Sequence, residues 1–101
     1  MKAVVFSGTT EGRVFSRQLA ALGAEVLVSV ATPLGAEEQG KADDISVHCG
    51  RLTTEEMTAL LQGAALCIDA THPYAAVVTQ NICRACAAAE VPCYRCLREE
   101  S

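Results

Sequence analysis

The chain has 101 residues, 50% of them hydrophobic and 20% charged, a length that suits one compact domain and leaves no room for two. Its net charge of −4, its aromatic content of 4% and its lack of tryptophan argue against a nucleic-acid-binding protein, which needs clustered basic side chains and exposed rings. No apolar run approaches the roughly 18 residues of a membrane span, and the N-terminus has no signal-peptide pattern. We therefore expect a cytoplasmic protein with no nucleic-acid and no membrane partner.

Short apolar runs alternate with helical patterns along the whole chain, which predicts a repeated β-α-β order. The runs are nearly continuous in apolar residues, as in parallel sheets that helices cover on both faces. We predict an α/β fold, a single Rossmann-like domain over residues 1–101 with a doubly wound parallel sheet of about five strands. The predicted strands are Ala3 to Phe6, Glu25 to Val30, Ile45 to Cys49, Leu66 to Asp69 and Val91 to Arg95.

The first predicted helix runs from about Glu11 to Leu22, with Phe15, Leu19 and Leu22 on one face and Gly23 as its C-cap. The segment 31–44 after the second strand contains prolines, glycines and acidic pairs, and we predict a solvated loop there.

Two more helices are predicted in the second half of the chain. One begins at Thr53, where Thr53 and Glu56 have the spacing of a capping box, and its buried stripe would be Met57, Leu60 and Leu61. The other has Pro73 near its first position. Its residues at helical spacing are Val78, Ile82, Ala85, Cys86 and Ala89.

The first strand passes through a turn framed by Gly8 and Gly12 into the first helix. Glycine allows the backbone to approach a ligand closely, and the N–H groups at a helix start attract phosphate. The spacing lacks the middle glycine of the dinucleotide fingerprint. The turn is therefore either a phosphate cradle or a tight turn without a ligand.

Small and polar residues follow four of the predicted strands. Ligands of open parallel sheets bind outside the carboxyl ends of the strands, so these residues would share one ligand site. The predicted site residues are Gly8, Thr9, Thr10, Glu11, Gly12, Ser29, Ala31, Thr32, Gly50, Arg51, Thr71, His72 and Pro73.

The end of the second strand bears on the type of cofactor. A site for NAD usually has an acidic residue roughly 20 residues after the glycines, where it binds the ribose 2′-hydroxyl. Here that position is Ser29, with Thr32 close by and Arg51 after the neighbouring strand. These residues favour a 2′-phosphate, so we expect NADPH rather than NADH. The alternative is that Ser29 merely ends a strand.

Four separated motifs carry a family resemblance: Gly8 to Arg13, Ser29 to Thr32, Gly50-Arg51 and Ile68 to Ala75, with Asn81 and Arg95 beyond them. Together they resemble the N-terminal half of precorrin-6A reductase, a family that includes the cobalt-precorrin-6A enzymes of the anaerobic cobalamin pathway. The resemblance covers essentially the whole chain, and its most specific part is the Asp-Ala-Thr-His-Pro run. It implies an enzyme that uses NADPH to reduce one carbon–carbon double bond of a corrin precursor in vitamin B12 biosynthesis.

Members of this family continue into a second α/β domain, and the resemblance implies that NADPH and the tetrapyrrole lie between the two domains. This chain would be the cofactor-binding half. We expect no turnover by it alone, and self-association through a face that the missing C-terminal domain would cover. The alternative is a nucleotide-binding module that shares the sheet and lacks the chemistry.

The expected roles follow from location along the sheet edge. Thr9 and Thr10, with the amides around Gly8, would hold the pyrophosphate, whereas Ser29, Thr32 and Arg51 would face the adenosine ribose and its phosphate. Thr71 and His72 would contact the nicotinamide side or an acidic arm of the substrate.

No catalytic residue is assigned from the sequence. His72 is either the acid that protonates the substrate carbon or a cap of the third helix. Asp69 either binds ligand or accepts hydrogen bonds from the turn after its strand. His48, inside a strand, is expected to be a packed side chain.

The chain has six cysteines, and four of them form two C-x-x-C pairs, a pattern typical of zinc sites. The first pair, Cys83 and Cys86, falls in a predicted helix. The second pair, Cys93 and Cys96, falls in an extended segment, where residues three apart point to opposite faces. We therefore expect free cysteines and no metal, with a four-cysteine zinc domain as the alternative.

Overall fold

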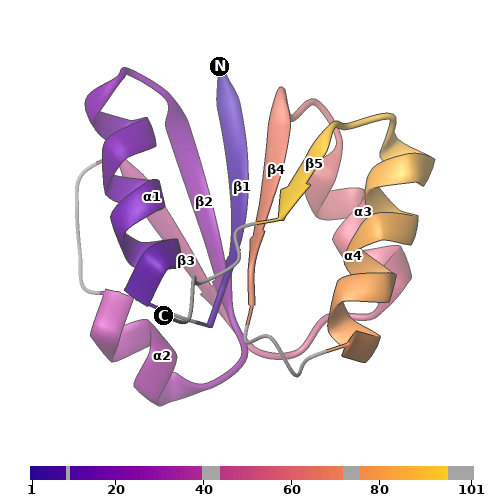
Figure 1. Ribbon diagram of the computed structural model, residues 1–101, viewed down its shortest axis with the longest axis horizontal. Helices are drawn as coiled ribbons and strands as arrows, with labels where there is room; N and C mark the ends of the chain where they lie inside the picture. Colours follow the sequence, from indigo (N-terminus) through magenta and orange to yellow (C-terminus); the bar gives the residue numbers. More distant parts are fainter. Residues whose placement is uncertain (9, 40–43, 72–75, 96–101) are drawn as a thin grey trace, which may run out of the picture.

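The computed structural model describes residues 1–8, 10–39, 44–71 and 76–95, which form a five-stranded parallel sheet between two layers of helices (Figure 1). The strands are β1 (Lys2–Ser7), β2 (Glu25–Val30), β3 (Ile45–Cys49), β4 (Leu66–Ala70) and β5 (Cys93–Arg95). The helices are α1 (Thr10–Ala21), α2 (Pro33–Gln39), α3 (Thr54–Leu61) and α4 (Ala76–Ala89). The predicted α/β fold with a doubly wound sheet is confirmed, and the predicted strands agree with the observed ones to within two residues at either end.

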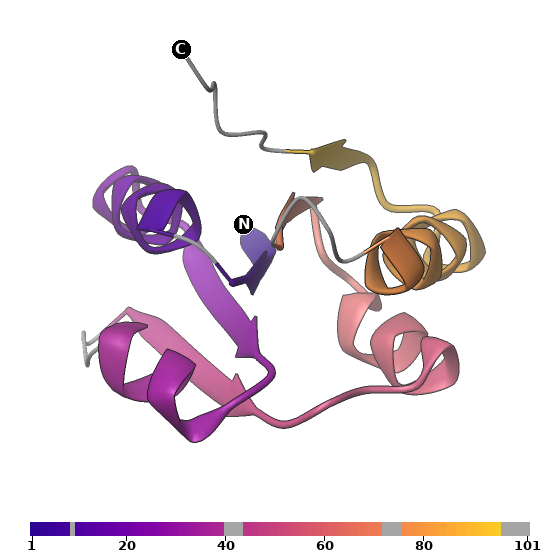
Figure 2. The ribbon, with the colours of Figure 1, turned by 60° about the horizontal axis from the view of Figure 1, so that its bottom comes forward.

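The strand order is β3-β2-β1-β4-β5, so the chain reverses its direction across the sheet between β1 and β4. Helices α1 and α2 cover one face and helices α3 and α4 cover the other, as both ribbon views show (Figures 1 and 2). The helices that follow β1 and β4 therefore leave the sheet on opposite faces. In such sheets the crevice for a ligand opens at the carboxyl ends of these two strands.

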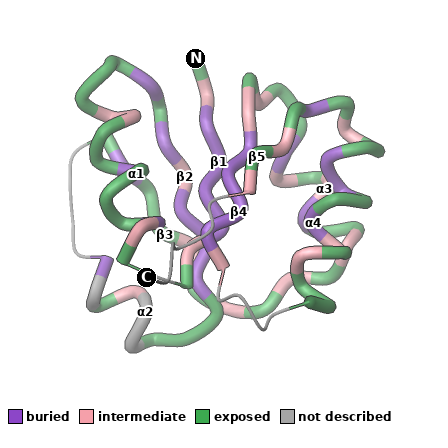
Figure 3. The backbone as a smooth tube through the Cα atoms, in the orientation of Figure 1, coloured by how far each residue is buried: buried purple, intermediate pink, exposed green. Residues whose placement is uncertain are grey.

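Two apolar clusters, one on each face, form the core. The central strands are the most continuously buried part of the chain (Figure 3). Strand residues alternate between the faces because successive side chains of a strand point in opposite directions. In β1, Val4 and Phe6 belong to the cluster under α3 and α4, whereas Val5 belongs to the cluster under α1 and α2. Helices thus exclude water from both faces of the central strand.

Helix α1 buries a different face from the predicted one. Phe15 is 39% exposed and Leu22 is 84% exposed, whereas Gly12 and Ser16 are buried. Of the three predicted residues, only Leu19 packs against the core. The small side chains allow α1 to lie close to the sheet, and this close approach turns the bulkier residues outwards. The predicted C-cap is confirmed, because Gly23 has the left-handed φ of 92° that glycine adopts readily at this position.

The segment predicted as a loop contains the short helix α2. Pro33 occupies its first position, where the fixed φ of proline suits a helix. Its last residue, Gln39, is buried. The Gln39 side-chain Nε2 donates to Ser16 Oγ at 2.8 Å, and the Gln39 backbone carbonyl oxygen accepts from the Arg17 side chain at 3.2 Å. These contacts with α1 stabilise a helix that the local sequence does not indicate.

The predicted capping box of α3 is present. Thr53 Oγ1 accepts from the backbone N–H of Glu56 at 3.1 Å, and the Glu56 carboxylate accepts from the backbone N–H of Thr53 at 3.0 Å. The hydrogen bond from the Thr53 backbone lowers the pKa of Glu56. The hydrogen bond to the ionised Glu56 therefore stabilises the fold fully above the ordinary pKa of a glutamate. This stabilisation decreases as the pH falls through the lowered pKa of Glu56.

Replacing the cap, Thr53→Ala, is expected to lower the free energy of unfolding by about 1 kcal/mol, since the hydrogen bond from the backbone N–H of Glu56 to Thr53 Oγ1 at the start of α3 is lost. Urea denaturation followed by circular dichroism measures this loss. Thr54→Ala, one residue later and outside the box, serves as the control. An equal loss in the two variants would contradict the role of the capping box.

Helix α4 buries Ile82, Ala85 and Cys86 as predicted, whereas Val78 near its start is 38% exposed. Pro73, the predicted first position, lies outside the described residues. Among the helices that the structure describes, none combines the length and apolarity that crossing a membrane requires.

Candidate functional site

A cavity of about 500 Å³ opens at the carboxyl edge of the sheet, on the side of α3 and α4. Its volume lies within the range typical of small-molecule sites. The ends of β1, β2 and β4, the segment after β3 and the first turns of α4 all contribute to its wall. It is lined by Phe6, Ser7, Ser29, Val30, Ala31, Gly50, Arg51, Leu52, Met57, Thr71, Val77, Val78 and Asn81.

The structure brings together part of the predicted site. The predicted residues that line the cavity are Ser29, Ala31, Gly50, Arg51 and Thr71. The predicted residues that do not line it are Gly8, Thr10, Glu11, Gly12 and Thr32. Thr9, His72 and Pro73 lie outside the described residues, so the structure does not place them.

The polar part of the wall comes from separate elements. Ser29 is buried at the end of β2, and Arg51, just after β3, is exposed at the cavity mouth. Thr71 follows β4, and Asn81 lies on α4. A long cationic side chain at the mouth and neutral hydrogen-bonding groups inside form an environment suited to a phosphate-bearing ligand.

Much of the wall is apolar, and the predicted site does not include the bulky residues Phe6, Met57, Val77 and Val78 that contribute to it. Phe6 lies on the α3 and α4 face by strand alternation, but only the packed structure shows that the other three surround the same space. Asn81 is part of the family resemblance and is not one of the predicted site residues. It also lines the cavity.

The two glycines of the first turn have structural roles in the described chain. The Gly8 N–H donates to the carbonyl oxygen of Ala70 at 3.1 Å, so this amide is not directed at a phosphate. A Cβ atom on Gly12 would lie 2.3 Å from Ser7 Oγ and 3.1 Å from Ala70 Cβ. Gly12 therefore permits close helix–strand packing, the part played by the third glycine of the dinucleotide fingerprint.

The end of β4 is fixed by a buried ion pair. Asp69 is 1% exposed, and its carboxylate accepts from Arg95 Nη1 at 2.7 Å, from the Thr71 hydroxyl at 2.6 Å and from the Thr71 backbone N–H at 3.1 Å. The same Arg95 nitrogen donates to Thr79 Oγ1 at 2.6 Å. Asp69 therefore satisfies the turn after its strand, the second of its two predicted roles, and it holds Thr71 at the cavity wall.

His48, which is expected to be a packed side chain, does not line the cavity. His48 is half-buried in β3, the edge strand next to β2. Its partial burial agrees with the expected packed side chain.

Three cysteines meet away from the cavity, between the sheet and α4. The Sγ atoms of Cys67, Cys86 and Cys93 all lie within 4.8 Å of one another. The hydrogen bond with Cys67 lowers the pKa of Cys93 to about 6, whereas the hydrogen bond with Cys93 raises the pKa of Cys67. Burial raises the pKa of Cys86 to about 11. All three are free thiols in the structure.

Comparison with solved structures supports the fold assignment. A structure of CobK precorrin-6A reductase superimposes with a TM-score of 0.82 and 30% sequence identity, over 98% of this chain and 39% of that chain. A putative epimerase from Bacteroides thetaiotaomicron superimposes with a TM-score of 0.72 at 20% identity, a likeness of fold alone.

Two curated relatives have the name cobalt-precorrin-6A reductase. The cobalt-precorrin-6A reductase of Salmonella typhimurium is 42% identical over 96% of this chain, and that of Priestia megaterium is 32% identical over 91%. The chain spans 37% and 36% of the lengths of these two proteins. The family model described as precorrin-6x reductase CbiJ/CobK matches residues 2–101. With this match along nearly its whole length, the chain belongs to the precorrin-6x reductase CbiJ/CobK family.

Proposed function

We propose that this chain is the NADPH-binding part of a reductase that reduces a double bond of precorrin-6A or cobalt-precorrin-6A in cobalamin biosynthesis. The observation that carries the proposal is the cavity at the carboxyl edge, where Ser29, Arg51 and Thr71 from three different strand ends line one space. Family membership supports the reductase chemistry, and the strand order supports a dinucleotide at this edge.

The preference for a phosphorylated cofactor rests on the ends of β2 and β3. After β2 the first acidic residue is Glu37, so no carboxylate follows the strand where an NAD site places one. A carboxylate at that position would repel a 2′-phosphate. Arg51 at the cavity mouth supplies positive charge instead, and guanidinium groups bind phosphate through paired hydrogen bonds.

Bound NADPH would supply the hydride, and the residues of this chain would bind and orient it. Arg51 and Ser29 would hold the adenosine ribose and its phosphate, and the apolar wall would exclude water from the rest of the space. The first-turn amides of α1, which begins at Thr10, would face the pyrophosphate. Thr71, fixed by Asp69, would lie towards the reacting end.

Titration with NADPH and NADH, followed by the fluorescence of the reduced nicotinamide, tests the proposal. We expect NADPH to bind more tightly, and Arg51→Met to weaken NADPH binding by roughly tenfold or more while changing NADH binding little, since one charged phosphate contact is lost. Arg84→Met, on the exposed face of α4, is the matched control. A preference of the unaltered chain for NADH, or an equal effect of Arg51→Met on both cofactors, would contradict the proposal.

The substrate would lie between this chain and a further domain of the reductase, because the relatives are much longer than the part matched here. We therefore expect the 101-residue chain to bind NADPH without consuming it when precorrin-6A is added. Oxidation of NADPH by this chain alone, followed by absorbance, would show that the cofactor-binding part needs no partner domain.

A further inference from the structure

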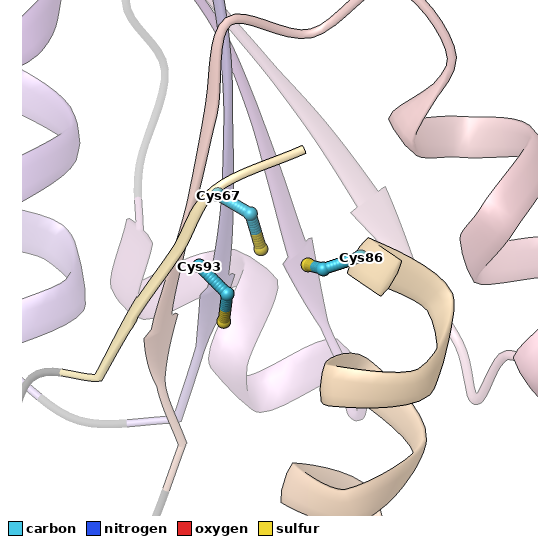
Figure 4. A group of neighbouring side chains, drawn as sticks. All are labelled: Cys67, Cys86 and Cys93. Atoms are coloured by element: carbon cyan, nitrogen blue, oxygen red, sulfur yellow. The ribbon is translucent and has the colours of Figure 1, made fainter. Parts of the chain in front are cut away.

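The cysteine cluster between the sheet and α4 has a geometry that simple core packing does not require. Cys67 comes from β4, Cys86 from α4 and Cys93 from β5, yet their sulfur atoms lie close together (Figure 4). Cys67 and Cys93 are direct register partners on neighbouring strands, and Cys86 faces them from the helix that covers these strands. Cys67 and Cys86 belong to the apolar core on this face of the sheet, and Cys93 packs against it.

The spacing of the three sulfur atoms suits a single metal ion. Sulfur atoms bonded to one zinc ion at about 2.3 Å lie about 4 Å apart. The observed sulfur atoms lie within 4.8 Å of one another, so small side-chain rotations bring them to this distance. Thiolate is a soft ligand that favours zinc and copper(I) over magnesium or calcium.

A fourth cysteine lies at the edge of the cluster. Cys83 is one helical turn before Cys86 in α4, outside the group of three sulfur atoms that lie within 4.8 Å of one another. Burial and the neighbouring Cys93 both raise the pKa of Cys83. Cys67 and Cys86 are buried, whereas Cys83 is exposed and Cys93 is half-buried. The cluster therefore has a closed inner side and an outer side through which an ion can enter. Four protein sulfur donors match the tetrahedral coordination of structural zinc sites.

We propose that Cys67, Cys86 and Cys93, with Cys83 as the fourth donor, form a structural site for a thiophilic divalent cation, with zinc as the biological ion. One proton leaves each thiol as its sulfur binds the metal. The ion would link β4, β5 and α4. Strand β5 has only three residues and lies at the edge of the sheet, so it gains most from such a link. The sequence pattern pairs Cys93 with Cys96, but the structure pairs it with Cys67 of the neighbouring strand.

The test uses the whole 101-residue chain, reduced, freed of metal and kept anaerobic. Titration with Co²⁺ is expected to give thiolate-to-metal charge-transfer absorption and the visible bands of a tetrahedral ion, with a breakpoint at one equivalent. Zn²⁺ is expected to displace Co²⁺ and to raise the melting temperature. Cys49→Ser, an exposed cysteine outside the cluster, is expected to behave like the unaltered chain.

Cys93→Ala is expected to abolish the breakpoint at one equivalent, with circular dichroism verifying that the variant remains folded. Cys83→Ser changes an exposed residue and leaves the core intact, so it tests the site even if Cys93→Ala fails to fold. It is expected to lower the charge-transfer intensity by about a quarter, as one of four thiolates is lost. A chain without a breakpoint, or full intensity in Cys83→Ser, would overturn the four-cysteine site.

Discussion

Arg95→Met is expected to lower the free energy of unfolding by about 3–5 kcal/mol, because it leaves the buried carboxylate of Asp69 without its positive partner. Asp69 is 1% exposed, so water cannot replace the lost charge. Methionine has a similar length and keeps most of the packing of the arginine stem. Since the free energy of unfolding of small domains is about 5–15 kcal/mol, this variant is expected to be only marginally stable. Urea denaturation measures the change.

The converse change, Asp69→Asn, is expected to be milder. An asparagine oxygen can still accept from the Thr71 backbone N–H, and the Arg95 side chain is 27% exposed, so water can partly solvate its charge. Arg84→Met, an exposed arginine on α4, controls for the loss of one positive charge. Equal losses in Arg95→Met and Arg84→Met would show that the ion pair contributes nothing to stability.

Most of the fold could be predicted because the central strands β1, β2 and β4 are buried along most of their length. Such strands are nearly continuous apolar runs, and β2 has the predicted ends. The capping box of α3 was predictable for a local reason, since its two residues are three apart in the sequence and the side chain of each accepts from the backbone N–H of the other. Features that depend on sequence neighbours alone are the ones that a single sequence specifies well.

The buried face of α1 and the presence of α2 could not be predicted from the local sequence. The buried face of α1 is set by how closely the helix approaches β1, and hydrophobicity alone indicates the wrong face. Helix α2 is stabilised through Gln39 and Ser16, which lie 23 residues apart. Contacts of this kind depend on the relative position of two elements, which local propensity does not contain.

The candidate site divides in the same way. Strand ends were predictable, and Ser29, Arg51 and Thr71, which follow or end three strands, line one cavity. The apolar wall depends on how α3 and α4 pack, so Met57 and Val77 were not identified. The cysteine cluster was missed because Cys67 is isolated in the sequence and becomes the neighbour of Cys93 only through the pairing of β4 with β5.

Gly12→Ala is expected to destabilise the domain although alanine is the better helix former. The added Cβ would lie 2.3 Å from Ser7 Oγ and 2.9 Å from Ser7 Cβ. Rotation of the serine side chain can relieve the first contact, but Ser7 Cβ is fixed to the backbone of β1. Helix α1 must therefore move away from the sheet. Overpacking of this kind costs about 1–3 kcal/mol, against a gain of about 1 kcal/mol in helix propensity.

A double-mutant cycle separates this contact from any general effect of Gly12→Ala. Ser7→Gly alone is expected to cost about 1 kcal/mol, since glycine weakens a strand. In the Gly12→Ala background the same change removes both colliding atoms, so it is expected to restore stability. Additive losses in the double variant would show that Ser7 is not the obstacle.

The same cycle also has an expected effect on NADPH binding. Because α1 begins at Thr10, displacement of this helix is expected to weaken NADPH binding in Gly12→Ala, and adding Ser7→Gly is expected to restore it. Recovery of both properties together would tie the close packing of the first turn to cofactor binding.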